Sequence, residues 1–428
     1  MSQTFTGREQ ALSAKTVYLH IGTMKSGTTY LQDVMKSNKE LLAERGVLWP
    51  GRHWGDQVYA ARDLANINPH DYRPSIVAGS WQRLVDEIHA WDGHAAVISM
   101  EWLAGGAQPD HIRHAVETLA PAEVHVILTG RDLARNIPAT WQEDMQNWMT
   151  CSWQDFIAAV RDPESAPIDA GKRVWRQQDL GAILRKWNEV IPAERTHVIT
   201  VPPPGADPGA LWERFAAVIG IKPDEYSPPP RGVNTSLGVT SAELMRRVNT
   251  LSHKRGMKWR KSERLFKQIL SKQVLSQRKG KEPALVLPDE HWPWAIEQGK
   301  RIAAEVEQTG ARVWGDLAEL VPDRAHAREG ATPDQATDSE LLEAALDGIV
   351  GLVAHVQNKI PTLDQQQEME NRRHNQAQQG EAPRNHQEPA SQIVKRCLVE
   401  LAQRGGVMGA LYRFWQTGRR KLRGTTRS

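Results

Sequence analysis

The sequence predicts an α/β protein in which a parallel β-sheet is covered by helices on both faces, in three layers. Over about residues 16–322, short β-branched or apolar runs alternate with longer stretches of helical periodicity, a pattern typical of a helix-covered parallel sheet. In addition, a glycine-containing turn at residues 22–27 joins the first such run to the first helical stretch. We therefore expect one α/β domain over residues 16–322, followed by a helical and disordered C-terminal tail.

Four short runs are the predicted strands of this sheet. They are TVYLHI at residues 16–21, AAVIS at 95–99, EVHVILT at 123–129 and residues 196–201. The last run meets the proline cluster Pro202–Pro204, where a strand cannot continue. Ligands of such sheets bind beyond the carboxyl ends of the strands. The chemistry is therefore expected near residues 22–29, at Glu101 and near residues 131–136.

The composition is that of a folded protein without a nucleic-acid-coating surface. Of the 428 residues, 40% are hydrophobic, which suffices for a sizeable core, and the formal net charge is only +3. The two cysteines, Cys151 and Cys397, lie far apart and match no metal-ligand spacing. Residues 1–15 lack the apolar run of a signal peptide, and no stretch approaches the roughly 20 apolar residues of a membrane span. We expect a cytoplasmic protein with a disordered N-terminus over 1–15.

Three segments of different character follow the predicted domain. Residues 323–338 are polar and are predicted to be a linker, and residues 339–360 are predicted to form an amphipathic helix. The apolar positions of that helix alternate by four and three, as in the seam of a coiled coil; they are Leu342, Leu346, Ile349, Val353, Val356 and Ile360. This favours a homo-oligomer formed through 339–360, and packing of the helix onto the body is an equal alternative. Residues 361–392 are too poor in apolar side chains to fold alone and are predicted to be a disordered linker.

The last segment, residues 393–428, is predicted to be a basic amphipathic tail. It carries nine basic side chains against one acidic side chain, and its apolar positions fall on helical faces. Such a segment can lie on an anionic membrane surface, which would place the protein peripherally at the inner face of the membrane. A solvated basic helix, or a helix docked on the body, is the alternative interpretation.

The segment HIGTMKSGTTY at residues 20–30 has the composition of an anion-binding turn. A turn between a strand and a helix presents backbone N–H groups and the positive end of the helix dipole, which together hold a phosphate. Gly22 and Gly27 let the backbone approach the anion, and Lys25 adds a positive charge. The hydroxyl donors Ser26, Thr28 and Thr29 complete the set.

This turn is not a Walker A loop, in which the lysine follows the second glycine. Here Lys25 precedes Gly27 by two positions. Moreover, neither AAVIS nor EVHVILT ends in the acidic residue that holds magnesium in P-loop phosphotransferases. A P-loop nucleotide or small-molecule kinase is therefore an alternative rather than the leading interpretation.

The stretch TMKSGTTYLQ at residues 23–32 resembles the 5′-phosphosulfate-binding loop of the sulfotransferases that use 3′-phosphoadenosine 5′-phosphosulfate (PAPS). The resemblance implies the P-loop-like sulfotransferase fold for residues 16–322 and transfer of a sulfuryl group without a metal. It also implies that the loop residues bind the donor and that Lys25 stabilises the leaving phosphate. The donor-binding residues implied in the loop are Lys25, Ser26, Gly27, Thr28 and Thr29.

A second signature of this family is a strand that ends in arginine, with a serine about eight residues later. Both side chains bind the 3′-phosphate of the donor. Arg131 fits the arginine, but Ala139 stands where the serine is expected and Pro138 precedes it. The candidates to replace the serine are Arg135, Asn136 and Thr140.

A third element of the resemblance is Arg231–Gly232, just before VNTSLG. It is similar to the Arg/Lys-Gly element that closes over the 3′-phosphate in the family. The likeness as a whole spans about residues 15–322 and does not extend to the segments that follow.

The base that takes the acceptor's proton is His or Glu in the family. Glu101 directly follows the second predicted strand, and partial burial could raise its pKa toward neutrality. An alternative role for Glu101 is to pair with an arginine and order the cleft. His53 lies at a distance after Lys25 comparable to that of the catalytic Glu in glycan-modifying relatives, and it is the second candidate.

These patterns predict a sulfotransferase that moves a sulfuryl group from PAPS to a hydroxyl or amine of a glycan, a glycolipid or a small molecule. The alternatives are the kinase named above, which would require magnesium, and a non-catalytic nucleotide-binding protein that tethers through its tail. No nucleic acid is expected among the partners.

Overall fold

The computed structural model describes residues 15–67, 74–227 and 236–357. Arg231 and Gly232 lie outside these residues, as do the predicted linker 361–392 and the predicted basic tail 393–428. The predictions made for those residues, membrane contact among them, therefore remain predictions.

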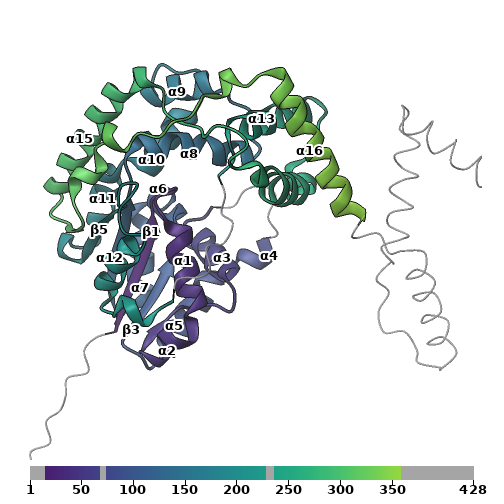
Figure 1. The fold of residues 1–428 in the computed structure, drawn as a ribbon. Coiled ribbons are helices and arrows are strands. Elements are labelled where there is room, and N and C mark those ends of the chain that lie inside the picture. The colour runs from purple at the N-terminus through teal and green to yellow at the C-terminus, as the bar shows by residue number, and fades with distance from the viewer. Residues whose placement is uncertain (1–14, 68–73, 228–235, 358–428) are drawn as a thin grey trace, which may run out of the picture. The chain divides into compact units, whose positions relative to one another are not determined.

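At the centre lies a sheet surrounded by helices (Figure 1). Within the described residues its six strands all run parallel, in the order β2-β3-β1-β4-β5-β6. The strands are β1 (Thr16–Gly22), β2 (Val47–Leu48), β3 (Ala95–Ser99), β4 (Glu123–Gly130), β5 (Thr196–Thr200) and β6 (Arg312–Trp314). The four predicted strands are confirmed. The sequence did not reveal β2 and β6, because strands of two and three residues are too short to show an alternating pattern.

Helices cover both faces of the sheet, because alternate residues along each strand enter different hydrophobic clusters. In β4, Val126 and Leu128 belong to a cluster that includes side chains of α8 and α11, whereas Ile127 belongs to a cluster with side chains of α1 and α12. These helices are α1 (Thr28–Ser37), α8 (Leu133–Gln146), α11 (Leu180–Asn188) and α12 (Ala210–Ile219). The predicted α/β class, a parallel sheet between helical layers, is confirmed.

The remaining helices fill in around this frame. In the first half they are α2 (Lys39–Glu44), α3 (Trp54–Leu64), α4 (Pro74–Val77), α5 (Ser80–His89), α6 (Trp102–Gly106), α7 (Pro109–Leu119), α9 (Trp153–Arg161) and α10 (Ala170–Gln178). In the second half they are α13 (Val239–Lys254), α14 (Trp259–Glu263), the π-helical segment η3 (Arg264–Val274), α15 (Trp292–Gln308) and α16 (Asp338–Gln357). No helix among the described residues is both long and apolar enough to span a bilayer.

Residues 323–335, which we call the strap, belong to the stretch predicted to be a linker, but they pack against the body. The Ala331 N–H donates to the Ala284 carbonyl over 2.9 Å, the Val286 N–H donates to the Ala331 carbonyl over 3.3 Å, and Pro333 is buried. These anchors use backbone groups, so the polar composition of the strap gave no sign of them. The stretch predicted to be a linker over 323–338 therefore rests on the body along the strap.

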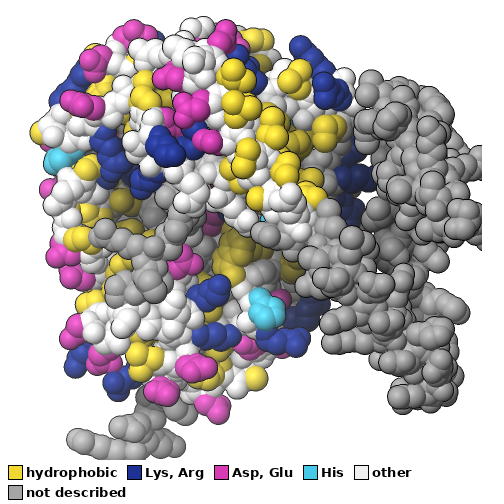
Figure 2. All heavy atoms as spheres, turned by 45° about the vertical axis from the view of Figure 1, so that its right-hand side comes forward, with side chains coloured by type: hydrophobic (Ala, Val, Ile, Leu, Met, Phe, Trp, Pro, Cys, Tyr) yellow, Lys and Arg dark blue, Asp and Glu magenta, His cyan; other side chains and the backbone are white. Residues whose placement is uncertain are grey.

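Helix α16 forms the predicted amphipathic helix as far as residue 357 and uses two different faces. Leu341, Ala344 and Gly348 are buried where α16 contacts α13 and η3. The predicted seam faces outward instead: its described members, Leu342, Leu346, Ile349, Val353 and Val356, are all exposed. Figure 2 views the molecule from the α16 side and shows hydrophobic side chains gathered on the surface. Packing onto the body therefore leaves the seam free, and self-association through it stays a prediction.

Candidate active site

The turn after β1 is a tight loop in which small residues allow close approaches. Gly22 has a φ of +115°, and a Cβ placed there would lie 3.0 Å from the Cα, Cβ and carbonyl oxygen of Glu101. Gly27 has a φ of +85°, and a Cβ there would lie 2.4 Å from the Leu211 side chain. Glycine is needed at both positions, because other residues are strained in this region of φ and would collide with these neighbours. The loop is thus built to bring β1 against the end of β3.

Side chains from α8 and α10 fix the loop from outside. The amide nitrogens of Asn136 and Gln178 both donate to the Met24 carbonyl, over 3.2 and 3.0 Å. The Asn136 amide also donates to the Gln178 side chain over 3.0 Å. Both N–H bonds of the Asn136 amide are therefore used within the protein. This buried residue supports the loop, whereas the sequence suggested that it contacts the 3′-phosphate.

Two of the three hydroxyl groups of the loop form hydrogen bonds within it, and the third is exposed. Ser26 and Thr28 are buried, and both donate to the Thr23 carbonyl, Thr28 over 3.1 Å. Thr29 is exposed at the start of α1. The first N–H groups of α1 have no intrahelical partner, as at the start of any helix, and Gly27 at the cap has no side chain to accept from them. This end of the helix is also the positive end of its dipole. The backbone N–H groups and the Thr29 hydroxyl are thus the donors that an anion could use, while the Ser26 and Thr28 hydroxyls hold the loop.

The ammonium group of Lys25 is paired with Glu143 of α8. The Lys25 Nζ lies 3.1 Å from Glu143 Oε2, and the Lys267 Nζ lies 3.5 Å from Oε1 of the same carboxylate. Asn147 donates to Glu143 Oε1 over 3.0 Å. Burial alone would raise the pKa of Glu143, but Lys25 and Lys267 outweigh it and lower that pKa to about 2. Glu143 is therefore ionised and neutralises the loop lysine.

Sequence reasoning missed Glu143 and Lys267. Glu143 sits in the middle of a helix with no motif around it, and Lys267 lies on η3, more than one hundred residues away. The one available signal is the helical spacing of Asn136, Thr140 and Glu143, which places all three on one face of the helix after the arginine.

Glu101 lies directly beyond β3, beside the loop. Its Oε2 accepts a hydrogen bond from the Gln32 amide over 3.3 Å. Burial is the main cause that raises the pKa of Glu101, and the nearby Glu143 charge adds to it, while the hydrogen bond from Gln32 and the charge of Lys25 oppose the rise. No arginine among the described residues lies within ion-pair distance of Glu101, so the alternative in which it pairs with an arginine is not supported. Two carboxylates near one lysine thus have pKa values shifted in opposite directions.

His53 has a different place in the structure. It caps the start of α3, where its N–H donates to the Asp56 side chain over 3.1 Å, and its own side chain is exposed. Within the described residues, no hydrogen bond or ion pair joins His53 to Lys25, Glu101 or Glu143. The structure therefore brings Glu101, but not His53, into contact with the loop.

Arg131, at the end of β4, is a largely buried cation without a counter-ion. Its Nη1 donates to the Lys25 carbonyl over 3.2 Å, and its buried Nε has no hydrogen-bond partner. No carboxylate among the described residues lies within ion-pair distance of it. Burial, and then the nearby Arg135, lower the pKa of Arg131 to about 10, so the guanidinium remains charged at neutral pH. An unpaired charge in such a place calls for an anionic partner.

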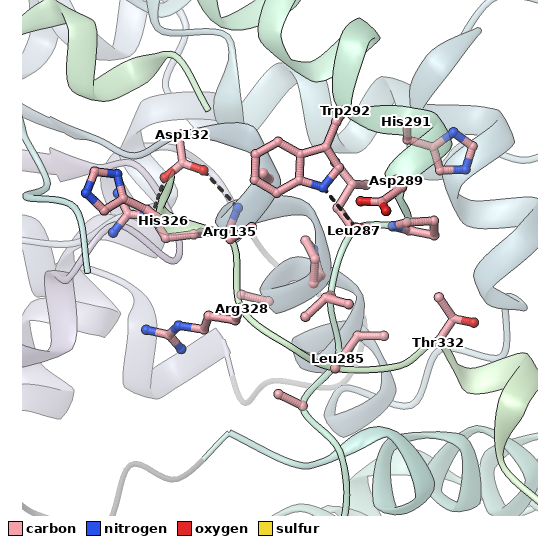
Figure 3. Close-up of a pocket in the computed structure, with 18 of the residues that line it drawn as sticks. Asp132, Arg135, Leu285, Leu287, Asp289, His291, Trp292, His326, Arg328 and Thr332 are labelled. Atoms are coloured by element: carbon pink, nitrogen blue, oxygen red, sulfur yellow. Dashed lines mark hydrogen bonds and ion pairs between the residues drawn. The ribbon is translucent and has the colours of Figure 1, made fainter. Parts of the chain in front are cut away.

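Arg131 lines a cavity of about 980 Å³ that runs along one face of α8 (Figure 3). Arg135, Pro138 and Ala139 line it too. Arg135 is already engaged: it pairs with Asp132 and donates to the carbonyls of Pro202 and Val201, over 2.8 and 3.2 Å.

Thr140 donates to the Asn136 side chain over 3.0 Å, on the loop side of α8. Of the three candidates to replace the serine, only Arg135 reaches the cavity.

Comparison with known proteins adds little to this geometry. No family model matches the chain, and no curated protein matches it. Among solved structures, a sulfotransferase from Alicyclobacillus acidocaldarius is similar, with 12% sequence identity and a TM-score of 0.34 over 57% of this chain and 98% of that chain. A similarity of this size does not identify a function. Among the described residues, no three His, Cys, Asp or Glu side chains gather closely enough to hold a metal ion.

Proposed function

We propose that this protein is a sulfotransferase that moves a sulfuryl group from PAPS to a hydroxyl or amine. The observation that carries the proposal is the contact between two anion-binding elements: Arg131, a buried cation without a counter-ion, donates to the carbonyl of the loop residue Lys25. Two adjacent sites for anions suit a nucleotide that has one anionic group at its 5′ end and another at its 3′ position.

The residues present fit such a donor. The free N–H groups at the start of α1, together with Thr29 and Lys25, would hold the 5′-phosphosulfate. Arg131 would bind the 3′-phosphate, and its buried Nε atom, which has no hydrogen-bond partner among the described residues, supports this assignment. Arg231 and Gly232 are proposed to close over the same phosphate, as the family resemblance implies.

The chemistry requires a base and a cation. In the transfer, the acceptor oxygen or nitrogen bonds to sulfur while the bond between sulfur and the phosphate oxygen breaks. Glu101, with its raised pKa, would accept the acceptor's proton. Lys25 would neutralise the charge that grows on the phosphate oxygen.

Calorimetric titration tests the proposal. We expect adenosine 3′,5′-bisphosphate to bind at least tenfold more tightly than ADP or ATP, in a buffer with EDTA, because only the bisphosphate reaches both sites. Tight binding of ATP that requires magnesium would instead favour a kinase. Binding of none of the three would favour a non-catalytic role.

A further inference from the structure

Most residues of the strap line the cavity that Arg131 also lines, and Figure 3 shows His326, Arg328 and Thr332 of the strap beside it. The strap is anchored at both ends. At its start, Arg324 pairs with Asp289, and its guanidinium lies 4.7 Å from the centre of the Trp292 ring. At its end, Ala331 exchanges backbone hydrogen bonds with residues 284 and 286. The residues between these anchors are therefore held over the cavity.

The second anchor depends on a glycine. A Cβ at Gly330 would lie 2.3 Å from the Ala284 carbonyl oxygen and 2.5 Å from the Val286 side chain. Any larger residue would push the strap away from the segment on which it rests. The position of the strap can thus be changed without removing any charge.

Arg328 lies between the two anchors and lines the cavity. Figure 3 shows its side chain extending from the strap with no interaction drawn to the other residues in view. No carboxylate among the described residues lies within ion-pair distance of Arg328, and its positive charge is one of the causes that lower the pKa of Arg131. Two arginines that have no ion-pair partner within the described part of the chain therefore line the same cavity.

The acidic side chains that line the cavity do not form ion pairs with Arg131 or Arg328. Five of the seven that line it lie within ion-pair distance of a basic side chain. These pairs are Asp132 with Arg135, Asp289 with Arg324, Glu290 with His291, Glu319 with Arg214 and Asp323 with His326. In two of these pairs the partner is a histidine, which is charged only when protonated. The other two acidic side chains, Glu329 and Asp334, are exposed, as is Arg328. Among the described residues, Arg131 and Arg328 thus line the cavity with no carboxylate within ion-pair distance of either guanidinium group.

We propose that Arg328 binds the 3′-phosphate of the donor together with Arg131, so that the strap completes the donor site. This inference rests on the proposed function. A phosphate monoester carries between one and two negative charges and three acceptor oxygens, which suits two guanidinium groups approaching from different sides. Ala139 on α8 cannot make the contact to the 3′-phosphate that a serine would make there. Arg328 would supply a contact to that phosphate from the strap instead.

Titration with two nucleotides separates this role from a structural one. Adenosine 3′,5′-bisphosphate carries the 3′-phosphate and adenosine 5′-monophosphate lacks it, while both carry the group that the loop would bind. We expect Arg328→Gln to weaken binding of the bisphosphate roughly tenfold and to change binding of the monophosphate less than twofold. Arg113→Gln, which removes an exposed arginine on α7 outside the strap, is the matched control and should change neither affinity. Gly330→Ala should weaken bisphosphate binding selectively, because it displaces the strap.

The outcomes distinguish this inference from the proposed function. If the unmodified protein does not prefer the bisphosphate over the monophosphate, the proposed function fails and this inference fails with it. If the unmodified protein prefers the bisphosphate, and Arg328→Gln either leaves both affinities unchanged or weakens both equally, only the role of Arg328 is overturned. Selective loss of bisphosphate affinity in Arg328→Gln and Gly330→Ala, with both affinities unchanged in Arg113→Gln, supports it.

Discussion

Glu143 of α8 holds the loop lysine Lys25 in an ion pair of 3.1 Å. An anion that binds the loop must therefore compete with this carboxylate for the lysine. Because Lys267 also contacts Glu143, the carboxylate keeps a cation when Lys25 turns away from it. Breaking the pair between Lys25 and Glu143 should therefore make the free energy of donor binding less favourable.

Replacing Glu143 by Gln should raise the affinity for adenosine 3′,5′-bisphosphate about fivefold. The substitution keeps the shape of the side chain but removes the competing charge, which corresponds to about 1 kcal/mol for a partly buried pair. Calorimetric titration measures the change, and Glu117→Gln on α7 is a control far from Lys25 in the fold. Unchanged or weaker binding would show that Glu143 does not compete with the ligand.

Replacing Glu101 by Gln should lower kcat at least a hundredfold and leave bisphosphate affinity within about twofold, because a general base contributes roughly that much to turnover. In the unmodified protein the rate should rise with pH as Glu101 ionises. Since burial raises the pKa of Glu101, this rise should lie at higher pH than for an ordinary glutamate. A pH–rate profile checks the position of the rise, and full activity of Glu101→Gln would exclude this residue as the base.

Gly22→Ala should cost both stability and turnover. It combines a positive φ with a contact of 3.0 Å to Glu101, so we expect about 2 to 3 kcal/mol of destabilisation and displacement of Glu101. Gly205→Ala is the matched control, because Gly205 has a φ of +90° but no atom within 4 Å of the added Cβ. It should cost only the conformational strain, about 1 kcal/mol. Urea unfolding compares the two, and equal costs would mean that the contact with Glu101 is not limiting.

Stability should fall as the pH falls from about 6.5 toward 4, in part because of His197. Its ring lies 2.9 Å from that of His125, and burial, then the charge of His125, lowers the pKa of His197 to about 4. The unfolded chain, with a histidine pKa near 6.5, binds the proton first, so acid favours unfolding. At pH 5.5 this amounts to about 1 kcal/mol. Urea unfolding of His197→Gln should show a smaller loss between pH 7 and pH 5.5; an identical loss would contradict this origin.

The two faces of α16 should respond differently to substitution. Ala344 is fully buried and Leu346 is 55% exposed. Ala344→Leu should lower the free energy of unfolding by about 1 to 3 kcal/mol through overpacking, whereas Leu346→Glu should change it by less than about 0.5 kcal/mol. Sedimentation of Leu346→Glu tests the predicted self-association, because a charge in the seam should dissociate any oligomer formed through it. An oligomer that persists in Leu346→Glu would show that the seam is not its interface.

The sequence predicted the parts of this protein that depend on local pattern. The four central strands follow from their apolar composition, and the loop follows from glycine, lysine and hydroxyl residues at a strand-to-helix junction. Glu101 was placed at the site because parallel strands end at one edge of the sheet. In the structure Glu101 lies against Gly22, which follows from the same rule because both residues are at the carboxyl ends of neighbouring strands.

What the sequence could not predict depends on long-range contacts. The pairing of Lys25 with Glu143 and Lys267 joins three distant segments, and no motif marks the last two. Asn136 is one of three candidates to replace the serine because it lies near Arg131 in sequence, yet in the structure its amide donates to the Met24 carbonyl. The strap looked like a linker because backbone hydrogen bonds and a glycine leave almost no trace in composition.

Transfer of radiolabelled sulfuryl from PAPS, in EDTA, to a panel of alcohols and amines tests the central claim most directly. The unmodified protein should release adenosine 3′,5′-bisphosphate and label at least one acceptor. Glu101→Gln should bind the donor but label none. Absence of transfer by the unmodified protein to every acceptor, together with phosphate transfer from ATP when magnesium is added, would contradict the proposed sulfotransferase function.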